Sequence, residues 1–301
     1  MSKISTPAME KLRKKKKYNV EGVSSPGKEA WKRLRKNKAA VAGMMIIIFM
    51  LLVAVFAPVL APYPYQAQDY AAVRQAPSAA HLFGTDHLGR DLFSRCIYGA
   101  RYSLPIGMVC VCIGLLIGGT LGLLAAYFGG TTDNIIMRII DVIQAIPSTL
   151  LCIALVAILG NGLWQLIVAI AAGQIQGMTK SVRAAVFMVR NNEYVDSSKS
   201  IGVSDVKIMI RHLIPNAVGM IVINAIGGVS GAILTISSLS YLGIGLVDPT
   251  PEWGAILSVG KTYMSVAPYM VLFPGICIGL TVVAFNLFGN GLRDALDPRL
   301  K

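Results

Sequence analysis

The sequence predicts an all-α membrane protein with six transmembrane helices. Of its 301 residues, 54% are hydrophobic and only 14% are charged, whereas a soluble domain carries roughly 25% charged residues. The mean hydropathy is +0.62. Six apolar runs each reach the length of about 20 residues that a helix needs to cross the hydrocarbon core of a bilayer. Composition and segment length together indicate a multi-pass membrane protein.

The expected spans follow one another along the whole chain. The first is too long for the apolar core of a cleaved signal peptide, so we expect a retained helix. The third and fourth spans lie in one long uncharged run. We expect a tight turn at Gly160-Asn161-Gly162 to divide this run into two helices. The six spans lie at 39–60, 102–127, 135–159, 163–182, 217–239 and 266–289.

Basic residues are distributed unevenly between the two sides of these spans. With the N-terminus inside, 23 of the 28 Lys and Arg residues fall on the inner side and five on the outer side. Basic loops stay in the cytoplasm, so we expect both termini there. This predicts a basic cytoplasmic tail at 1–38, an extracytoplasmic segment with an amphipathic helix at 61–101, a five-helix core at 102–292 and a short cytoplasmic tail at 293–301.

The basic tail directly precedes an apolar span. Its position favours anionic membrane lipid as the partner of its charges, and argues against nucleic acid.

Residues that catalysis, metal binding or ATP hydrolysis need are missing from the expected spans. His81, His87 and His212 all lie outside them, and no HExxH, paired-carboxylate or GxSxG arrangement occurs. The five cysteines form no CxxC pair, so neither a disulfide framework nor a metal site is expected. There is no GxxxxGK[ST] phosphate loop. We therefore expect a non-catalytic chain without cofactor or metal, which is either a passive pore or receives energy through a partner.

Glycines recur at intervals of four residues in two of the spans. Gly114, Gly118 and Gly122 lie in the second span, and Gly227 and Gly231 in the fifth. Small residues at this spacing allow close helix packing in lipid, and we expect that role for both groups.

Uncharged polar residues inside the spans are candidates to line a transport path, since polar groups in a bilayer face a cavity or another helix. Interhelical hydrogen bonds explain them equally well. Arg138 and Asp141, three residues apart, are expected to pair within one helix. The candidates for the path are Gln144, Ser148, Gln174, Asn224, Ser230, Thr235 and Asn286.

The polar stretch 193–216 stands between two long uncharged segments, on the expected cytoplasmic side. Residues 194–201 favour a short helix, which Gly202 would end with a positive φ. Ser204 then suits an N-cap, with Asp205 in the first turn of a second helix.

The second helix of this stretch is amphipathic. Lys207 and Arg211 lie on one face, and Pro215 ends the helix or begins the next span. A helix of this kind either lies on the membrane surface or inserts its apolar face into a groove on a partner. The predicted apolar stripe comprises Val206, Met209, Ile210 and Leu213.

The same stretch resembles the cytoplasmic EAA loop of ABC-importer permeases. That loop has Glu-Ala-Ala, three residues, Gly and later a hydrophobic-Pro ending; here Asp196-Ser197-Ser198 replaces the triplet, and Gly202 and Pro215 match. The resemblance implies a coupling helix at 193–215 that docks into a cleft on an ATPase subunit. The residues it assigns to coupling are Tyr194, Asp196, Ser197, Ser198, Gly202, Ser204, Asp205, Val206, Met209, Arg211, His212 and Pro215.

Three more motifs narrow the resemblance to dipeptide/oligopeptide permeases of the C-subunit type. They are GTDHLGRD at 84–91 with the residues up to Arg101, PTPEWG at 249–254, and GLRDALDPRL at 291–300. The resemblance runs from about residue 31 to the end of the chain. It implies the type I ABC-importer permease fold in the cytoplasmic (inner) membrane of a bacterium.

The resemblance also implies partners. These are a homologous second permease subunit, two cytoplasmic ATPase subunits that carry ATP and Mg, and an extracytoplasmic substrate-binding protein. The substrate implied is a dipeptide or oligopeptide, and nickel or another small solute is the alternative within the same architecture. Two other classes of membrane protein are less consistent with the sequence. A secondary transporter would need ionisable residues in its spans. A membrane scaffold would not need the capped amphipathic helix of the stretch 193–216.

Charged and aromatic residues of the outer segments are candidates for an extracytoplasmic gate or a contact with the binding protein. Asp86 is expected to cap an interfacial helix that contains an Asp91–Arg95 pair. Trp253 fits an anchor at the membrane interface or a part of the gate. The candidates are Asp86, Arg90, Asp91, Glu252 and Trp253.

Overall fold

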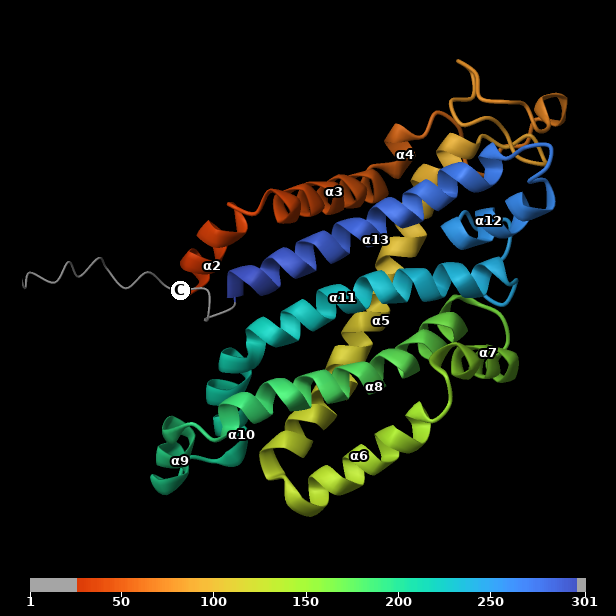
Figure 1. The fold of residues 1–301 in the computed structure, drawn as a ribbon. Helices are drawn as coiled ribbons and strands as arrows, with labels where there is room; N and C mark the ends of the chain where they lie inside the picture. The colour runs from red at the N-terminus through yellow and green to blue at the C-terminus, as the bar shows by residue number, and fades with distance from the viewer. Residues whose placement is uncertain (1–25, 297–301) are drawn as a thin grey trace, which may run out of the picture.

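Fourteen short and long helices make up the part of the chain that a computed structural model describes, residues 26–296 (Figure 1). Within that range the all-α class is confirmed, and the β-pairing consists of one isolated bridge between Thr85 and Asp91. The helices are α2 (Pro26–Leu34), α3 (Lys38–Val55), α4 (Ala57–Leu60), η1 (Tyr70–Ala72), α5 (Leu92–Phe128), α6 (Gly130–Gln144), α7 (Ser148–Leu159), α8 (Leu163–Arg190), α9 (Glu193–Ser200), α10 (Asp205–Ile208), η2 (Met209–Leu213), α11 (Ile214–Tyr241), α12 (Trp253–Thr262) and α13 (Tyr269–Leu296).

Four helices in the described range are long and apolar enough to cross a membrane: α3, α5, the continuous run α10–α11, and α13. A fifth span is possible by length and composition if α6 and α7 count together. The fourth expected span lies within α8. This helix is long enough to cross a membrane, but its polar residues make it too hydrophilic to count among these candidates. The structure thus supports four or five of the six expected spans, and the count of six stays a prediction.

The third expected span is not one straight helix. α6 and α7 are bent by 80° relative to each other. Pro147 stands immediately before α7, and proline interrupts a helix because it lacks the N–H donor and crowds the preceding turn. The sequence contained this signal, and the expectation of one span at 135–159 overlooked it.

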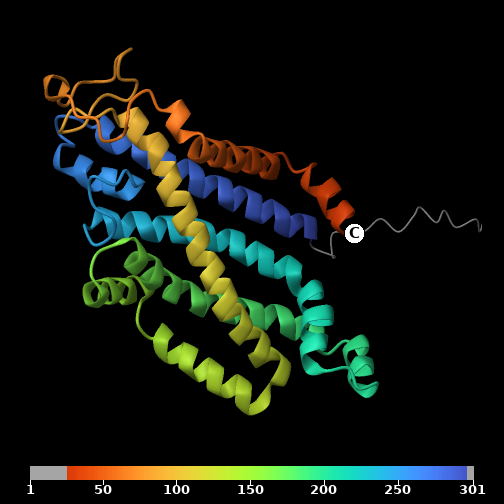
Figure 2. The same cartoon turned by 180° about the vertical axis from the view of Figure 1, so that it is seen from behind.

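α5 is the central helix of the bundle and crosses α8 and α11 (Figure 2). A Cβ at Gly114 would lie 2.6 Å from the Cβ of Gln174, and one at Gly118 or Gly122 would collide with backbone carbonyls of α8. Close packing is therefore confirmed for these three glycines. Within the described chain no neighbour lies within 4 Å of a Cβ placed at Gly227 or Gly231, so close packing at these two glycines stays a prediction.

α3 lies alongside α13, and both pack on the rest of the bundle (Figure 1). Gly43 permits this approach, since a Cβ there would lie 2.6 Å from the carbonyl oxygen of Ala284. The main hydrophobic core joins α3, α5, α7, α8, α11, α12 and α13. α12 was not predicted, because a helix of 10 residues is too short to give a membrane-span signal.

The two ends of the bundle differ. α9, α10, α2 and the end of α13 lie at one end, and the loops around η1 together with α12 lie at the other (Figures 1 and 2). The segment 61–101 holds no separate amphipathic helix. Residues 92–101 instead form the first turns of α5, which begins at Leu92.

Candidate functional site

The stretch 193–216 forms a corner of two short helices, as predicted, which we call the cytoplasmic corner by its expected side. α9 ends at Ser200, and Gly202 follows with a φ of +78°, a conformation that glycine adopts without steric cost. Ser204 is the N-cap of α10, although its side chain makes no capping hydrogen bond. α10 continues through η2 into α11, with Pro215 in the first turn of α11. The corner is therefore continuous with a long helix.

The predicted apolar stripe of the second helix is partly wrong. Met209 and Leu213 are buried together with Ile208, which the stripe did not include, whereas Val206 and Ile210 are 60% and 61% exposed. Val206 and Ile208 both belong to α10, before the π-helix η2 begins at Met209, so the buried face is rotated from the predicted stripe already in the first turn. The exposed apolar side chains are therefore on the outside of the corner and not in its core.

Contacts with α5 and α8 hold the buried side of the corner in place. Tyr127 of α5 donates a hydrogen bond of 2.5 Å from Oη to the carboxylate of Asp205, and Lys199 lies over the same ring at 5.2 Å. Arg190 at the end of α8 donates to the carbonyl of Ala126 over 2.7 Å. Asp205 is itself exposed, but its carboxylate accepts this hydrogen bond from α5. It serves as a link between α10 and α5.

The serines that replace the alanines of the EAA triplet are accommodated within α9. Ser197 and Ser198 donate their hydroxyl hydrogens to the carbonyls four residues earlier, over 2.8 Å and 2.7 Å. Ser200 does the same over 3.0 Å. Each hydroxyl finds a partner in its own helix, so the Asp-Ser-Ser opening is compatible with a folded first helix.

The outer surface of the cytoplasmic corner is rich in exposed apolar side chains. Ile201 is 79% exposed, and Tyr194 lies near the His212 ring with a centroid separation of 6.2 Å. Asp196 and Arg211 are exposed as well. Clustered exposed apolar groups rimmed by polar residues mark surfaces that bind other proteins. The exposed apolar residues of the corner are Tyr194, Ile201, Val206, Ile210 and Ile214.

At the opposite end of the bundle, two arginines and two aspartates form an ion-pair cluster. Arg90 binds Asp86 over 2.6 Å and makes two hydrogen bonds to Asp248, and Arg95 binds Asp248 over 2.9 Å. The side chains of Arg90, Arg95 and Asp86 are at most 4% exposed, and that of Asp248 is 31% exposed. Burial raises the pKa of Asp248, but the hydrogen bond from Arg90 and the charges of Arg95 and Arg90 outweigh it, so the net pKa is below its usual value.

The predicted arrangement around Asp86 is wrong. The N-cap of α5 is Asp91, whose carboxylate accepts from the Ser94 N–H over 2.7 Å and also contacts His81 Nδ1 at 2.9 Å. Asp86 instead accepts from the backbone of Arg90 within a tight turn. Arg95 pairs with Asp248 and Asp86, not with Asp91, because Asp91 is occupied by the cap.

Glu252 and Trp253 lie in the core. Both are fully buried, so the expected position of Trp253 at the lipid interface is wrong. Its Nε1–H donates to the carbonyl of Cys96 over 2.9 Å, and the Glu252 carboxylate accepts from Ser103 and from the N–H of Ala255. Burial raises the pKa of Glu252, against hydrogen bonds that lower it.

The five candidates for a gate or a contact with the binding protein (Asp86, Arg90, Asp91, Glu252 and Trp253) thus all make contacts inside the protein. Buried side chains cannot contact a separate protein in this conformation, so a direct contact of these side chains with a binding protein does not fit the structure. What the cluster does is fix the loop before α5 to the loop after α11.

The seven polar residues proposed to line a transport path do not cluster at one site. Ser230 contacts Asn286 across α11 and α13 at 3.2 Å, and Gln174 donates to the carbonyl of Gly228 over 3.5 Å. Thr235 bonds only within its own helix. Gln144 accepts from Lys180, and Ser148 lies near Gly173. Within residues 26–296, the side chain of Asn224 forms no hydrogen bond. The first two pairs are interhelical bonds; a role in a path stays a prediction for all seven.

Several residues that organise these sites were not predicted. Tyr127, Asp248, Ser103 and Lys180 all act through partners that are far away in sequence. Asp141 pairs with Lys180 of α8 over 2.8 Å and not with Arg138. The one available signal was charge: Lys180 and Arg183 of α8, like Asp141 and Asp133 of α6, are ionisable residues next to apolar runs. Within the described residues, no group of three or more His, Cys, Asp or Glu side chains is placed to hold a metal ion.

The fold is that of a membrane permease of an ABC importer. The structure is similar to a chain of the methionine ABC transporter MetNI in an inward-facing conformation, with a TM-score of 0.56, 18% identity, and coverage of 67% of this chain and 96% of that chain. The model of the family described as binding-protein-dependent transport system inner membrane component matches residues 118–301. A second family model, that described as the N-terminal TM domain of oligopeptide transport permease C, matches residues 25–77.

The chain belongs to the binding-protein-dependent transport system inner membrane components, and within them it is an OppC-type permease. It is 43% identical over 282 residues to a glutathione transport system permease protein of Pectobacterium atrosepticum, covering 93% of this chain and 94% of the relative. It is 44% identical over 277 residues to a dipeptide transport system permease protein of Alkalihalophilus pseudofirmus, covering 92% and 91%. The family consists of non-catalytic, multi-pass components of the inner membrane.

Proposed function

We propose that this permease forms one half of the translocation path for short peptides, and that its cytoplasmic corner receives the force of ATP hydrolysis. ABC importers of this family work with ATPase and binding-protein partners. The full assembly we infer contains a homologous second permease subunit, two ATPase subunits that bind ATP and Mg, and an extracytoplasmic binding protein. The dipeptide and glutathione transport named for the relatives supports a peptide as the substrate.

The observation that carries the coupling role is the combination of an exposed apolar surface with rigid attachment. Val206 and Ile210 point outward, while Ile208 and Leu213 are fully buried beneath them. An exposed apolar helix face of this kind fits a groove on a partner protein. A surface helix in the membrane plane would instead have no need of the polar anchors at Asp205 and Arg190.

The attachments of the corner give it a route to the membrane helices. Two residues separate α8 from α9, η2 runs directly into α11, and Tyr127 joins α10 to α5. Movement of the ATPases against the corner would therefore displace α5, α8 and α11 together. Such a displacement is what an exchange between inward-open and outward-open states needs.

The orientation we propose places the corner and both termini in the cytoplasm. The corner, α2 and the end of α13 share one end of the bundle (Figure 1), and the positive charge of the sequence is concentrated on the same segments.

Copurification of the ATPase subunits with the detergent-solubilised permease tests the coupling role. Ile210→Asp places a charge on the exposed apolar side, and we expect it to release the ATPases or abolish peptide-stimulated ATP hydrolysis. Asn192→Asp is the matched control, because it adds a carboxylate at an exposed N-cap position that tolerates Asp. Full coupled transport by Ile210→Asp would contradict the assignment.

Uptake into proteoliposomes tests the substrate separately. A dipeptide or glutathione should be accumulated when ATP, the ATPases and the binding protein are present, and nickel should not. Uptake of nickel without uptake of either peptide would contradict the substrate class and leave the coupling role standing.

A further inference from the structure

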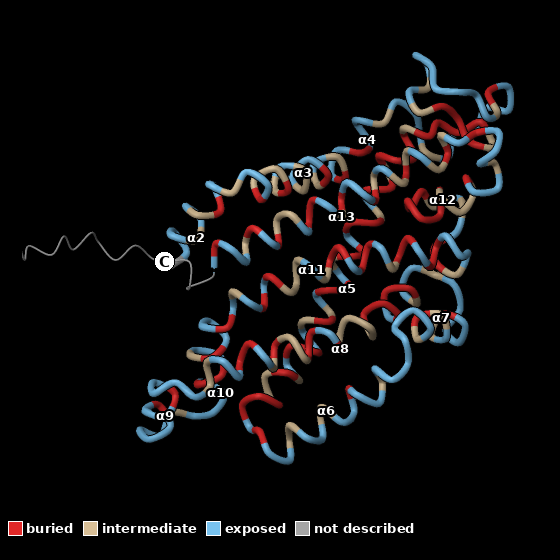
Figure 3. Tube along the Cα trace, viewed as in Figure 1, coloured by how far each residue is buried: buried red, intermediate tan, exposed pale blue. Residues whose placement is uncertain are grey.

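The exposed surface of α6 is divided into a polar stripe and an apolar stripe. Asn134, Arg138 and Asp141 are exposed at i, i+4 and i+7, a spacing that places them on one face of a helix. The neighbouring face carries large apolar side chains, and most of the length of α6 is exposed (Figure 3). The apolar stripe consists of Ile135, Ile139 and Val142, which are 56%, 56% and 66% exposed.

The two stripes require different surroundings. An apolar stripe suits lipid or an apolar neighbour. Charged side chains within a membrane helix usually face a water-filled cavity, because burying them in hydrocarbon is costly. A shallow, open hollow lies along the polar stripe, and all of its lining residues belong to α6: Asn134, Ile135, Met137, Arg138 and Asp141.

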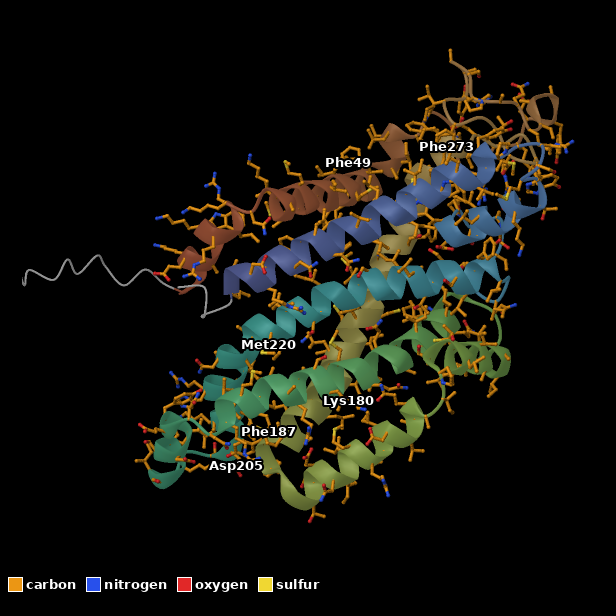
Figure 4. All side chains as sticks on the ribbon, in the orientation of Figure 1. Phe49, Lys180, Phe187, Asp205, Met220 and Phe273 are labelled. Carbon is orange, nitrogen blue, oxygen red and sulfur yellow. The ribbon has the colours of Figure 1, made fainter. Side chains whose placement is uncertain are left out.

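The charges around the hollow do not cancel. Lys180, on the stretch of α8 beside α6 (Figure 4), binds Asp141 over 2.8 Å and also donates to Gln144. Asp141 is thus already neutralised. Arg138 forms no ion pair with any side chain in residues 26–296, so the group carries one surplus positive charge.

That surplus resides on a guanidinium, which binds carboxylates with two parallel hydrogen bonds. Arg138 is exposed and lines the hollow, so its donors are free to meet a ligand. A free peptide always carries such a carboxylate at its C-terminus.

We propose that Arg138 is a substrate-binding residue in the translocation path, where it holds the free carboxylate of the peptide in transit. The Lys180–Asp141 pair keeps α6 against α8 and orients the hollow. This proposal rests on peptide import as the function, and nothing else in it depends on how the ATPases dock.

Thiol accessibility tests whether the polar stripe faces water. Arg138→Cys and Ile139→Cys are compared in a background in which Cys96, Cys110, Cys112, Cys152 and Cys277 are replaced and peptide transport is retained. In the complete complex, we expect a charged, membrane-impermeant methanethiosulfonate to label position 138 at least tenfold faster than position 139. Equal labelling, or a position 138 that is labelled only when the second permease is absent, would overturn the assignment to a path.

Transport of matched peptides tests the ligand. The probes are alanyl-alanine and alanyl-alaninamide, each supplied at a concentration that saturates the binding protein, as established by direct titration. Arg138→Gln should lower uptake of the free acid about tenfold, the scale of a lost charge-assisted hydrogen bond, and leave uptake of the amide unchanged; Arg138→Lys should restore part of the loss.

The outcomes separate this proposal from the proposed function. Equal loss for both peptides, or no loss for either, contradicts carboxylate binding at Arg138 while peptide import stands. If the wild-type complex imports no peptide at all, the proposed function fails, and labelling at position 138 still decides whether α6 lines the path.

Discussion

Arg90 and Asp248 are 158 positions apart, yet the guanidinium of Arg90 makes two hydrogen bonds, 2.9 Å and 2.8 Å long, to the Asp248 carboxylate. Arg95 shares the same carboxylate. The loop before α5 is thereby bound to the loop after α11. Since α5 and α11 are both anchored to the cytoplasmic corner at their other ends, this pair fixes the opposite end of the helices that the corner would move.

Asp248→Asn should destabilise the protein. It leaves two buried arginines against the single carboxylate of Asp86, and an uncompensated buried charge costs roughly 3–5 kcal/mol. We expect the lower end of that range, because the Asp248 side chain is 31% exposed. Thermal unfolding in detergent measures the loss. Asp294→Asn, an exposed carboxylate near the end of α13, should change stability by less than about 0.5 kcal/mol; equal stability of both variants would contradict the structural role of the cluster.

The stability that Asp248 contributes should depend on pH. Its pKa is lower in the folded protein than the ordinary value of about 3.9, so the folded state favours the charged form. The contribution is complete above the ordinary pKa and is lost as pH falls through the folded pKa. The difference in melting temperature between wild type and Asp248→Asn should therefore be constant near neutral pH and shrink below about pH 4. A difference that grows on acidification has the wrong sign for this ion pair.

Gly118→Ala should force α5 and α8 apart. The new methyl group would collide with the carbonyl oxygen of Ile175, which is backbone and cannot turn aside. Overpacking of this kind costs about 1–3 kcal/mol. Gly177→Ala is the matched control on α8, where a Cβ meets nothing within 4 Å, and alanine in a helix gains about 0.5–1 kcal/mol over glycine. Thermal unfolding of the two variants should shift in opposite directions.

Features governed by local chain chemistry were predicted correctly. The turn at Gly160 and the positive φ of Gly202 follow from the conformations open to glycine. That Gly114, Gly118 and Gly122 allow a close helix approach follows from their spacing, although the sequence did not indicate that α8 is the partner helix. The two turns depend on residues that are neighbours in the chain.

The features that were missed depend on tertiary contacts. Ile208 is buried and Val206 exposed within the α-helical turn of α10, because the contacts of the corner with the neighbouring helices, and not the spacing of its own apolar residues, select the buried face. The burial of Trp253 requires Gly99 on another helix to leave space for its ring. A single sequence cannot reveal which of many charges meet across 158 positions, as Arg90 and Asp248 do.

Tyr127→Phe should weaken the coupling between the cytoplasmic corner and α5 while leaving the corner folded. It removes the 2.5 Å hydrogen bond to Asp205 and retains the buried ring. Loss of a hydrogen bond to a charged partner costs about 1.5–3 kcal/mol, so the complex should assemble but import several-fold less peptide per ATP hydrolysed. Tyr241→Phe, the same change on an exposed side chain near the other end of the bundle, should leave that ratio unaltered. The measurement is the ratio of peptide imported to ATP consumed in proteoliposomes, compared between the two variants and the wild type. An unchanged ratio in Tyr127→Phe would mean that α8 and α11 transmit the movement without α5.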